Sequence, residues 1–404
     1  MNSSFFMLEF IWGIYMNKSD KYLIDLFYKS VNEDYQFNED IRDIDFNRIL
    51  KISSINRVSN CIYYGMLKLD KDIQSNISNI ESFKKECLIY GIKEKVQEND
   101  ILDIIKAFEK ENIDMLFFKG FVLKDIYPLK DMRVMGDIDF LVQEKDVDKA
   151  CKVLESIGFK KDENTDFNVE IGYKRNIEVE LHKKLAVSEK KYFDNAWDNK
   201  VKFLDYPNTY TLDINYHFIY LLDHAMHHMK KGGLGMKYPM DFYLYLNKYD
   251  VDFKFIKPIL KDLKLEKFAK LIILLCNKWF NLSLDKYESF IGDFKLTDKE
   301  LSVFEVFILS GGEYGLNRDI YTVQSVSQGN KLKYLLSKIF RPFRFVVKTD
   351  NPKWWQYVVF PYYYISYWFD YFILKGSKNI KKAKAYINSE DDIDLKDLFN
   401  KISK

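Results

Sequence analysis

The chain has 404 residues, more than one compact domain usually contains, so we expect at least two packed units whose core needs no disulfide staples. Its 62 Lys and Arg residues nearly balance its 60 Asp and Glu residues, and the formal charge of +2 gives no overall electrostatic reason to bind nucleic acid or an anionic membrane. The four cysteines lie far apart without CxxC or zinc spacing, which indicates buried thiols in a reducing cytoplasm and excludes a disulfide scaffold.

The N-terminal part of the chain, residues 1–112, is predicted to be helical. The apolar stretch 5–16 is about half as long as a bilayer-spanning helix and contains Glu9, so we expect a docked first helix rather than an export signal. Further on, apolar residues such as Leu23 and Leu26 recur at the spacing of a helix with one buried face.

The strand signals concentrate between residues 113 and 205. Short apolar runs bounded by turn residues indicate strands, and one longer run with helical spacing ends at a glycine, as helices often do. We therefore expect a small α/β unit here, with strands near 115–120, 137–142, 167–173 and 177–181 and a helix over 144–156 closed by Gly158.

Residues 206–404 again have mostly helical patterns, interrupted by a glycine-rich turn at 230–239. The stretch 355–374 is apolar and about long enough to span a bilayer, but polar residues and Pro361 interrupt it. We expect a buried or interfacial helix there, with membrane contact as the less favoured alternative. The predicted fold class is therefore α+β, with a small α/β unit between two helical regions.

Two aspartates stand two positions apart in the segment MGDIDFLV. Side chains of a strand alternate between its faces, so Asp137 and Asp139 point to one face while Ile138 points to the other. Adjacent carboxylates repel each other unless a cation is present, and Mg²⁺ prefers oxygen ligands. The pair therefore indicates a metal site, although aspartates are also common where a strand enters a turn.

The later segment NIEVELHKK predicts a second strand with Glu178, Glu180 and His182 on one face. If this face lies beside the two aspartates, three carboxylates from neighbouring strands can hold two metal ions roughly 4 Å apart, which suits phosphoryl or nucleotidyl transfer. Both glutamates face the same way, so their spacing does not choose between them.

A Lys-Gly pair ends the first strand of the α/β unit. Lys119 adds positive charge, Gly120 lets the backbone approach a ligand, and the short helix that follows presents N–H groups, a combination that suits a phosphate. The same pair is also common in turns that bind nothing, and lysine is abundant in this chain.

Taken in order, the segments LFFKG, YPLKDMRVMGDIDFLV, a helix ending in ESIGF, and VELH resemble the uncharacterised bacterial nucleotidyltransferase family of the polymerase-β superfamily. The core of the resemblance covers about residues 113–183, and LLDHAMHH and KYPMDFYLYL resemble the family's helical partner region more weakly. The resemblance implies a polymerase-β-like nucleotidyltransferase core, in which a small mixed sheet carries metal-binding carboxylates and packs on helices that close a nucleotide pocket.

The resemblance also implies roles for individual residues. Asp137, Asp139 and Glu180, with Glu178 as the alternate, would be the catalytic carboxylates that bind Mg²⁺ or Mn²⁺, with two ions in all. Glu180 is preferred because the family's glutamate directly precedes Leu-His. The nucleoside triphosphate would be bound by Lys119, Gly120, Arg133, Gly136, His182, His224 and His228. The wider superfamily usually has Gly-Ser where this chain has Lys-Gly, with no hydroxyl beside it.

Four of the five histidines lie on one predicted helix. His217, His224 and His228 share a stripe of this helix because they are spaced seven and four residues apart. Together with His182 they would also fit a zinc site, a less favoured alternative to packing at a domain contact or lining the nucleotide pocket. Asp241, in the helix after the glycine-rich turn, is a further candidate for supporting the site.

These features predict a cytoplasmic enzyme that moves a nucleoside monophosphate from an NTP to a hydroxyl acceptor and releases pyrophosphate. One alternative is a nucleotide-sugar glycosyltransferase that binds its metal through Asp137 and Asp139, although such folds usually place a parallel βαβ unit before this motif. Another alternative is a non-catalytic binding module, such as a toxin–antitoxin component. Nothing in the nearly neutral charge selects the acceptor.

Overall fold

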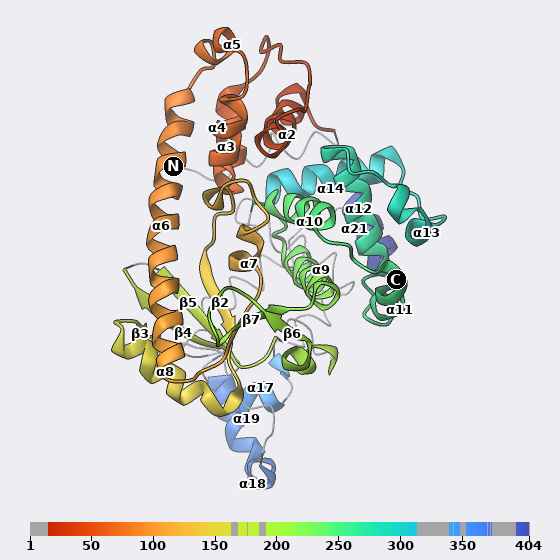
Figure 1. The fold of residues 1–404 in the computed structure, drawn as a ribbon. Coiled ribbons are helices and arrows are strands. Elements are labelled where there is room, and N and C mark those ends of the chain that lie inside the picture. The colour runs from red at the N-terminus through yellow and green to blue at the C-terminus, as the bar shows by residue number, and fades with distance from the viewer. Residues whose placement is uncertain are drawn as a thin grey trace.

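A seven-stranded mixed sheet positions the candidate site, with helices before and after it in the chain (Figure 1). The computed structural model describes residues 15–162, 169–175, 177–185, 191–312, 339–341, 343–347, 353–369, 371, 373 and 393–403. The fold is α+β, as the sequence predicts, and the strands cluster between two helical regions.

The strands follow the order β3-β4-β5-β2-β1-β7-β6 across the sheet. β2 pairs in parallel with β5, and β1 pairs in parallel with β7, while the other neighbours are antiparallel. The strands are β1 Met115–Phe117, β2 Asp137–Leu141, β3 Lys160–Lys161, β4 Val169–Lys174, β5 Ile177–His182, β6 Lys200–Lys202 and β7 Thr209–Leu212. The patterns in the sequence do not indicate β3, β6 or β7, and β7 continues the sheet past residue 205.

The helices up to the first strand include one long helix, α6, whose 31 residues extend over about 47 Å. Its C-terminal half buries Ile101, Ile104 and Phe108 beneath the sheet. The N-terminal helices are α2 Lys18–Val31, α3 Phe46–Ile55, α4 Ser59–Met66, α5 Lys71–Ser75 and α6 Ile80–Lys110. Between strands lie α7 Gly120–Lys124, α8 Val147–Ser156 and the 3-10 turns η1 Lys130–Met132, η2 Glu144–Asp146 and η3 Lys191–Asn199.

The C-terminal region begins with α9, the predicted histidine helix. The Asp213 side chain accepts hydrogen bonds from two backbone N–H groups at its start, and Gly232 ends it with φ of 99°. The helices are α9 Ile214–Lys231, α10 Lys237–Lys248, α11 Phe253–Asp262, α12 Glu266–Phe280, the turn η4 Asp285–Tyr287, α13 Glu288–Ile291, α14 Asp298–Gly311, α17 Phe343–Val347, α18 Trp354–Val358, α19 Phe360–Phe369 and α21 Ile393–Ser403.

The two faces of the sheet pack against different hydrophobic cores. The smaller core joins Ile138 and Val179 of the sheet to Leu154 of α8 and the apolar face of α6. The larger core takes the other face through Leu116 and Leu141, and it extends from α2 at one end of the chain to α21 at the other. The N-terminal and C-terminal helices therefore share one core, and the aspartates of β2 point to that side.

The structure tests only one of the two predictions about apolar stretches. The docked helix expected at 5–16 falls almost entirely outside the described residues. Residues 354–369 are mostly helical, as expected, and most of their apolar side chains are exposed, which contradicts the buried alternative but not the interfacial one.

No helix among the described residues has both the length and the apolar composition needed to cross a membrane.

Candidate active site

Two neighbouring parallel strands bring the predicted carboxylates side by side. In the register of β2 and β5, Asp137 lies beside Glu178 and Asp139 lies beside Glu180. Because the side chains of a strand alternate between its faces, these four acids and His182 share one face of the sheet. The register therefore concentrates negative charge over two adjacent strands.

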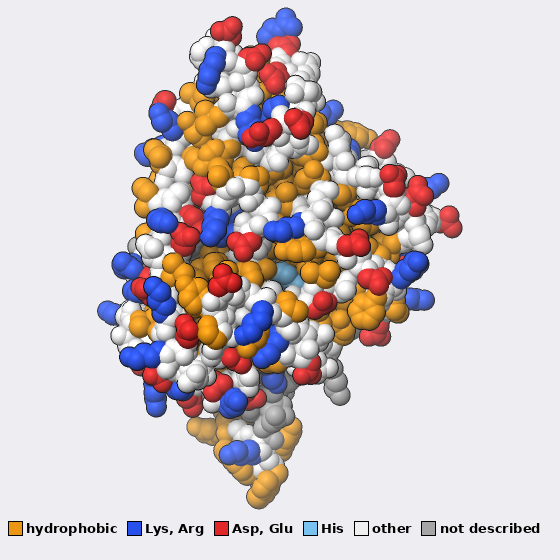
Figure 2. All heavy atoms as spheres, viewed as in Figure 1, with side chains coloured by type: hydrophobic (Ala, Val, Ile, Leu, Met, Phe, Trp, Pro, Cys, Tyr) orange, Lys and Arg blue, Asp and Glu red, His pale blue; other side chains and the backbone are white. Residues whose placement is uncertain are grey.

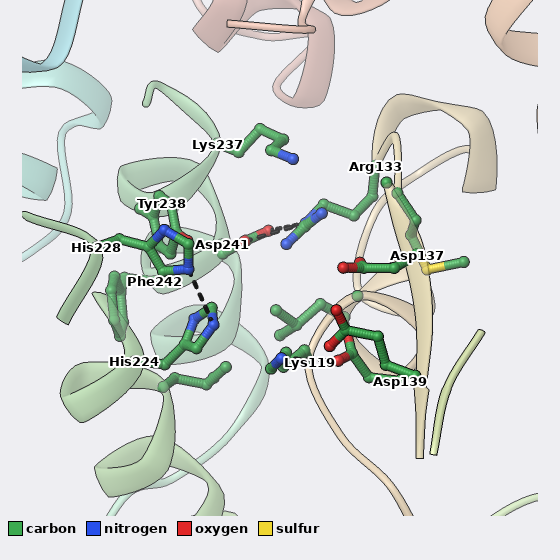
Figure 3. Close-up of a pocket in the computed structure, with 16 residues that line it drawn as sticks. Lys119, Arg133, Asp137, Asp139, His224, His228, Lys237, Tyr238, Asp241 and Phe242 are labelled. Carbon is green, nitrogen blue, oxygen red and sulfur yellow. Dashed lines mark hydrogen bonds and ion pairs between the residues drawn. The ribbon is translucent and has the colours of Figure 1, made fainter. Parts of the chain in front are cut away.

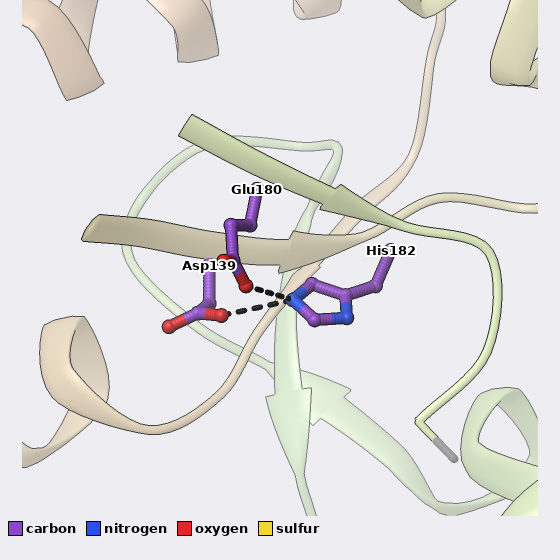
Figure 4. Close-up of side chains that lie close together, drawn as sticks. All are labelled: Asp139, Glu180 and His182. Atoms are coloured by element: carbon purple, nitrogen blue, oxygen red, sulfur yellow. Dashed lines mark hydrogen bonds and ion pairs between the residues drawn. The ribbon is translucent and has the colours of Figure 1, made fainter. Parts of the chain in front are cut away.

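Asp139, Glu180 and His182 form the tightest group on this face (Figure 4). His182 Nε2 lies 2.9 Å from Asp139 Oδ1 and 3.2 Å from Glu180 Oε2. One ligand atom from each of the three lies within 4.8 Å of the others, and no other group of three among the described residues has this spacing. The two carboxylates suit a divalent ion such as Mg²⁺ or Mn²⁺, whereas an imidazole donor is more typical of transition-metal ions.

Opposite charges keep Asp139 ionised. Burial would raise the pKa of Asp139, but the Lys119 ammonium, 2.7 Å from Oδ1, and His182 together outweigh burial and hold that pKa below its usual range. The charge of Asp139, together with burial, raises the pKa of Asp137 to about 7. Burial would lower the pKa of His182, but its hydrogen bonds to Asp139 and Glu180 raise it. The neighbouring carboxylates repel one another, and a bound cation would reduce this repulsion.

The Lys-Gly turn positions Lys119 through an uncommon backbone conformation. Lys119 itself has φ of 62° and ψ of −131°, a region that glycine favours, whereas Gly120 is not among the residues with positive φ. A Cβ on Gly120 would lie only 2.8 Å from Sδ of Met135, so this glycine makes room for the Met135 side chain. Backbone strain is thus stored at the residue whose ammonium contacts Asp139, as is common at functional sites.

A cavity of about 230 Å³ opens between the carboxylates and the helices α9 and α10 (Figure 3). Asp137, Asp139 and Glu180 line it from the sheet, and Lys237 and Tyr238 line it from α10. Acids that suit a metal ion and a cation that suits a phosphate therefore face the same space.

Arg133 reaches from the loop before β2 toward α10, where it meets Asp241 (Figure 3). Its Nε donates to both carboxylate oxygens of Asp241, at 2.7 and 3.0 Å, and the Tyr127 hydroxyl donates to Oδ1 at 2.7 Å. Lys237 Nζ donates to the carbonyl of Val134 at 3.3 Å. The two cations therefore converge beside the segment that leads into the aspartate strand.

The histidines of α9 fall into two environments. His224 and His228 line the cavity with their Nε2 atoms 3.1 Å apart, so one ring donates a hydrogen bond to the other. Burial, followed by the charge of Lys119, lowers the pKa of His224, which favours the neutral ring. His217 instead packs against Tyr245 in the core, where burial lowers its pKa to about 3. The histidines do not converge on one point, so the zinc alternative gains no support.

Most residues that the resemblance implies for nucleotide binding line this cavity: Lys119, Gly120, Arg133, Gly136, His224 and His228. His182 lies among the acids instead, and Glu178 does not line the cavity. Sequence reasoning missed Lys237, Tyr238 and Phe242. The one signal concerned Lys237, which precedes Asp241 by four residues, the spacing that places two side chains on one face of a helix.

Comparison with known proteins adds one result. The model of a family described as "Uncharacterised nucleotidyltransferase" matches residues 42–281, more than half of the chain, and this range contains the whole sheet and all the residues of the cavity. No curated protein and no solved structure matches the chain.

Proposed function

Because the chain belongs to the family of uncharacterised nucleotidyltransferases, we propose that it transfers a nucleoside monophosphate from a nucleoside triphosphate to a hydroxyl acceptor and releases pyrophosphate. One observation carries the proposal: a single cavity combines the carboxylates Asp139 and Glu180 with the cations Arg133 and Lys237. In nucleotidyl transfer the protein need not form a covalent bond with the substrate, so most of the catalysis comes from positioning the reactants and stabilising the charge on the phosphates.

The donor set of the site fits a divalent metal ion. Asp139, Glu180 and His182 would hold it, and Asp137 adds a carboxylate for the second ion that the resemblance implies. A Mg²⁺ or Mn²⁺ ion, when bound, supplies positive charge to the phosphate oxygens and lowers the pKa of an attacking hydroxyl. The crowding that raises the pKa of Asp137 supports this assignment, since acids without a cation gain nothing from being held together.

The chain's own cations would bind the phosphates. Asp241 and Tyr127 hold the Arg133 guanidinium in a fixed orientation, so it meets a phosphate without first losing side-chain freedom. Lys237 is buried and lies within hydrogen-bonding distance of the same loop. Lys119, held at Asp139, would contribute its charge at the end of the cavity where the metal carboxylates lie.

The helices of the C-terminal region would complete the nucleotide pocket. Tyr238 and Phe242 of α10 offer aromatic and apolar surface for the base or ribose, and His224 and His228 of α9 offer imidazole nitrogens for hydrogen bonds. In this proposal the unit 113–205 supplies the metal carboxylates, the region 206–404 closes the pocket, and the region 1–112 braces both through the shared core.

The test uses purified protein with each α-labelled NTP and Mg²⁺ or Mn²⁺, with cell extract as the source of acceptor. We expect Asp139→Asn and Glu180→Gln each to reduce label transfer by at least about 100-fold, the usual effect of removing a group that stabilises transition-state charge. Glu178→Gln is the matched control, since Glu178 lies on the same strand face outside the cavity, and it should retain most of the activity.

Each alternative predicts a different result in the same assay. Loss of transfer in Glu178→Gln with activity kept in Glu180→Gln would reverse the assignment of the glutamates. Release of UDP from a UDP-sugar would favour the glycosyltransferase. Absence of transfer with every nucleotide, together with metal binding that Asp139→Asn leaves unchanged, would favour a non-catalytic binding module.

A further inference from the structure

An aromatic segment projects from the lower end of the molecule, beyond the sheet (Figure 1). We call α17, α18, α19 and the described residues between 339 and 373 the aromatic hairpin. Ten of the sixteen residues from 354 to 369 are aromatic, and Figure 2 shows mostly apolar surface at this end. The segment lies outside the residues that the family model matches, and the proposed transfer reaction gives it no role.

The aromatic hairpin has its own internal packing. The ring of Phe343 in α17 contacts those of Tyr357 and Tyr363, with centroids 4.9 and 6.1 Å apart. Trp368 Nε1 donates to the carbonyl of Ile339 at 2.9 Å. These contacts fix α17 against α19, so the side chains on the outer face are held outward.

The outer face of the hairpin is apolar. Eleven of the twenty-one large apolar side chains that are exposed among the described residues lie between 340 and 373, so exposure is concentrated rather than scattered. Trp354, Val358, Tyr362, Ile365 and Phe369 are each more than half exposed and follow one another at intervals of three or four residues. A contiguous apolar surface of this kind marks a binding face in a folded protein.

The segment that contains this face is rich in basic residues. Between residues 331 and 384 the sequence contains twelve Lys and Arg residues but only two Asp and no Glu, whereas the whole chain is nearly neutral. Arg341 and Lys353 are exposed, and the described residues from 339 to 373 include no acid. The partner that covers the apolar face must therefore tolerate or attract the positive charge of this segment.

We propose that the aromatic hairpin docks the protein onto the surface of an anionic lipid bilayer. Trp and Tyr favour the boundary between headgroups and acyl chains, because their rings are apolar and their N–H and O–H groups remain hydrated. Basic residues beside such a face gain energy from anionic headgroups. The segment lies in the plane of the membrane, with its apolar side chains about 5–10 Å below the headgroup surface.

A second copy of the chain is the competing occupant, and two features argue against it. Helix pairs in proteins usually use aliphatic seams with opposite charges beside them, whereas this face is aromatic with basic residues beside it. Two copies would also bring two positively charged segments together, at an electrostatic cost that an anionic membrane turns into a gain.

The experiment measures co-sedimentation of the full chain with vesicles of phosphatidylcholine alone and of phosphatidylcholine with phosphatidylglycerol. We expect at least about tenfold tighter binding to the anionic vesicles, weakened by raising the salt from about 0.05 M to about 0.5 M. The variant Trp354→Ser, Val358→Ser, Ile365→Ser should bind at least about tenfold more weakly. The control Leu88→Ser, Ile92→Ser removes two apolar side chains of α6, 61% and 67% exposed, and should bind like the wild type.

A second readout needs no substitution in the hairpin. Lipids brominated near the headgroup should quench the tryptophan fluorescence of the wild-type protein on anionic vesicles. Wild-type binding that the triple substitution leaves unchanged would overturn the proposal. So would an absence of vesicle binding combined with self-association that the triple substitution abolishes, because the occupant would then be a second copy.

Discussion

The ion pair between Arg133 and Asp241 allows a quantitative test of how the cavity is built. Their side chains are 10% and 5% exposed, so the two charges compensate each other almost without water. Asp241→Ala would leave the guanidinium buried without its carboxylate and the Tyr127 hydroxyl without its acceptor. Removing one partner of a buried pair typically costs about 3–5 kcal/mol, so we expect a loss of this size in the free energy of unfolding.

The assay is denaturant unfolding at neutral pH, followed by circular dichroism and tryptophan fluorescence so that coincidence of the two curves tests two-state behaviour. Asp241→Asn keeps an acceptor for Tyr127 and should lose less than Asp241→Ala. Arg133→Met combined with Asp241→Leu removes both charges and should be more stable than Asp241→Ala alone. A loss below about 1 kcal/mol in Asp241→Ala, or a double variant as unstable as that single variant, would refute the reasoning.

Three further predictions concern packing, pH and metal. Gly65 of α4 packs so closely that a Cβ would overlap the carbonyl oxygen of Leu26, so Gly65→Ala should destabilise the protein by at least about 1–3 kcal/mol. At Gly91 of α6 a Cβ would meet almost nothing, so Gly91→Ala should stabilise the protein by about 0.5–1 kcal/mol. Burial lowers the pKa of His217 to about 3, from a value near 6.5 in the unfolded chain. The unfolded chain therefore binds a proton here that the folded protein does not, and the free energy of unfolding falls as the pH drops from about 6.5 to about 3. His217→Phe should reduce the slope of unfolding free energy against pH in this range by up to about 1.4 kcal/mol per pH unit. Mg²⁺ at about 100 times its Kd should stabilise the wild type by about 2.7 kcal/mol, and Asp139→Asn should lose most of this gain.

Each of the three has a contradicting outcome. Equal stabilities for the two glycine variants would mean that α2 and α4 separate without cost. A slope of unfolding free energy between pH 6.5 and 3 that His217→Phe leaves unchanged would mean that the buried ring is not neutral. A thermal shift with Mg²⁺ that persists in Asp139→Asn would place the ion elsewhere.

The carboxylates could be predicted from sequence because a strand has the simplest periodicity in proteins. Asp137 and Asp139 on one strand, and Glu180 and His182 on another, must share faces if the segments are strands, and the structure adds their parallel register. The match to the nucleotidyltransferase family confirms the family resemblance, while membership of the polymerase-β superfamily stays a prediction. The strands β3, β6 and β7 were missed because two to four residues are too few to show alternation, and unlike the equally short β1 none of them is a continuous apolar run.

The helix side of the cavity was harder to predict, because a helix reveals which face is buried but not what that face meets. Lys237 and Tyr238 lie in a segment whose pattern indicates only a packed helix, and their place opposite the acids depends on where α10 lies across the cavity from the sheet. For residues 354–369 the sequence left a buried and an interfacial helix open. Apolar composition is the same whether a segment is buried or exposed, so hydropathy alone could not choose between them, and the exposed side chains exclude only the buried helix.

The larger core also has a consequence for how the chain is made. α2, which ends at Val31, packs against α12, which begins at Glu266, and α21 near the C-terminus packs against α12 and α14. The main partner of α2 is α4, which follows soon after it in the chain, but at a synthesis rate of about 5–20 residues per second the part of α2 that α12 covers waits roughly 10–50 s for that contact. The larger core therefore cannot be complete until both α12 and α21 have been synthesised.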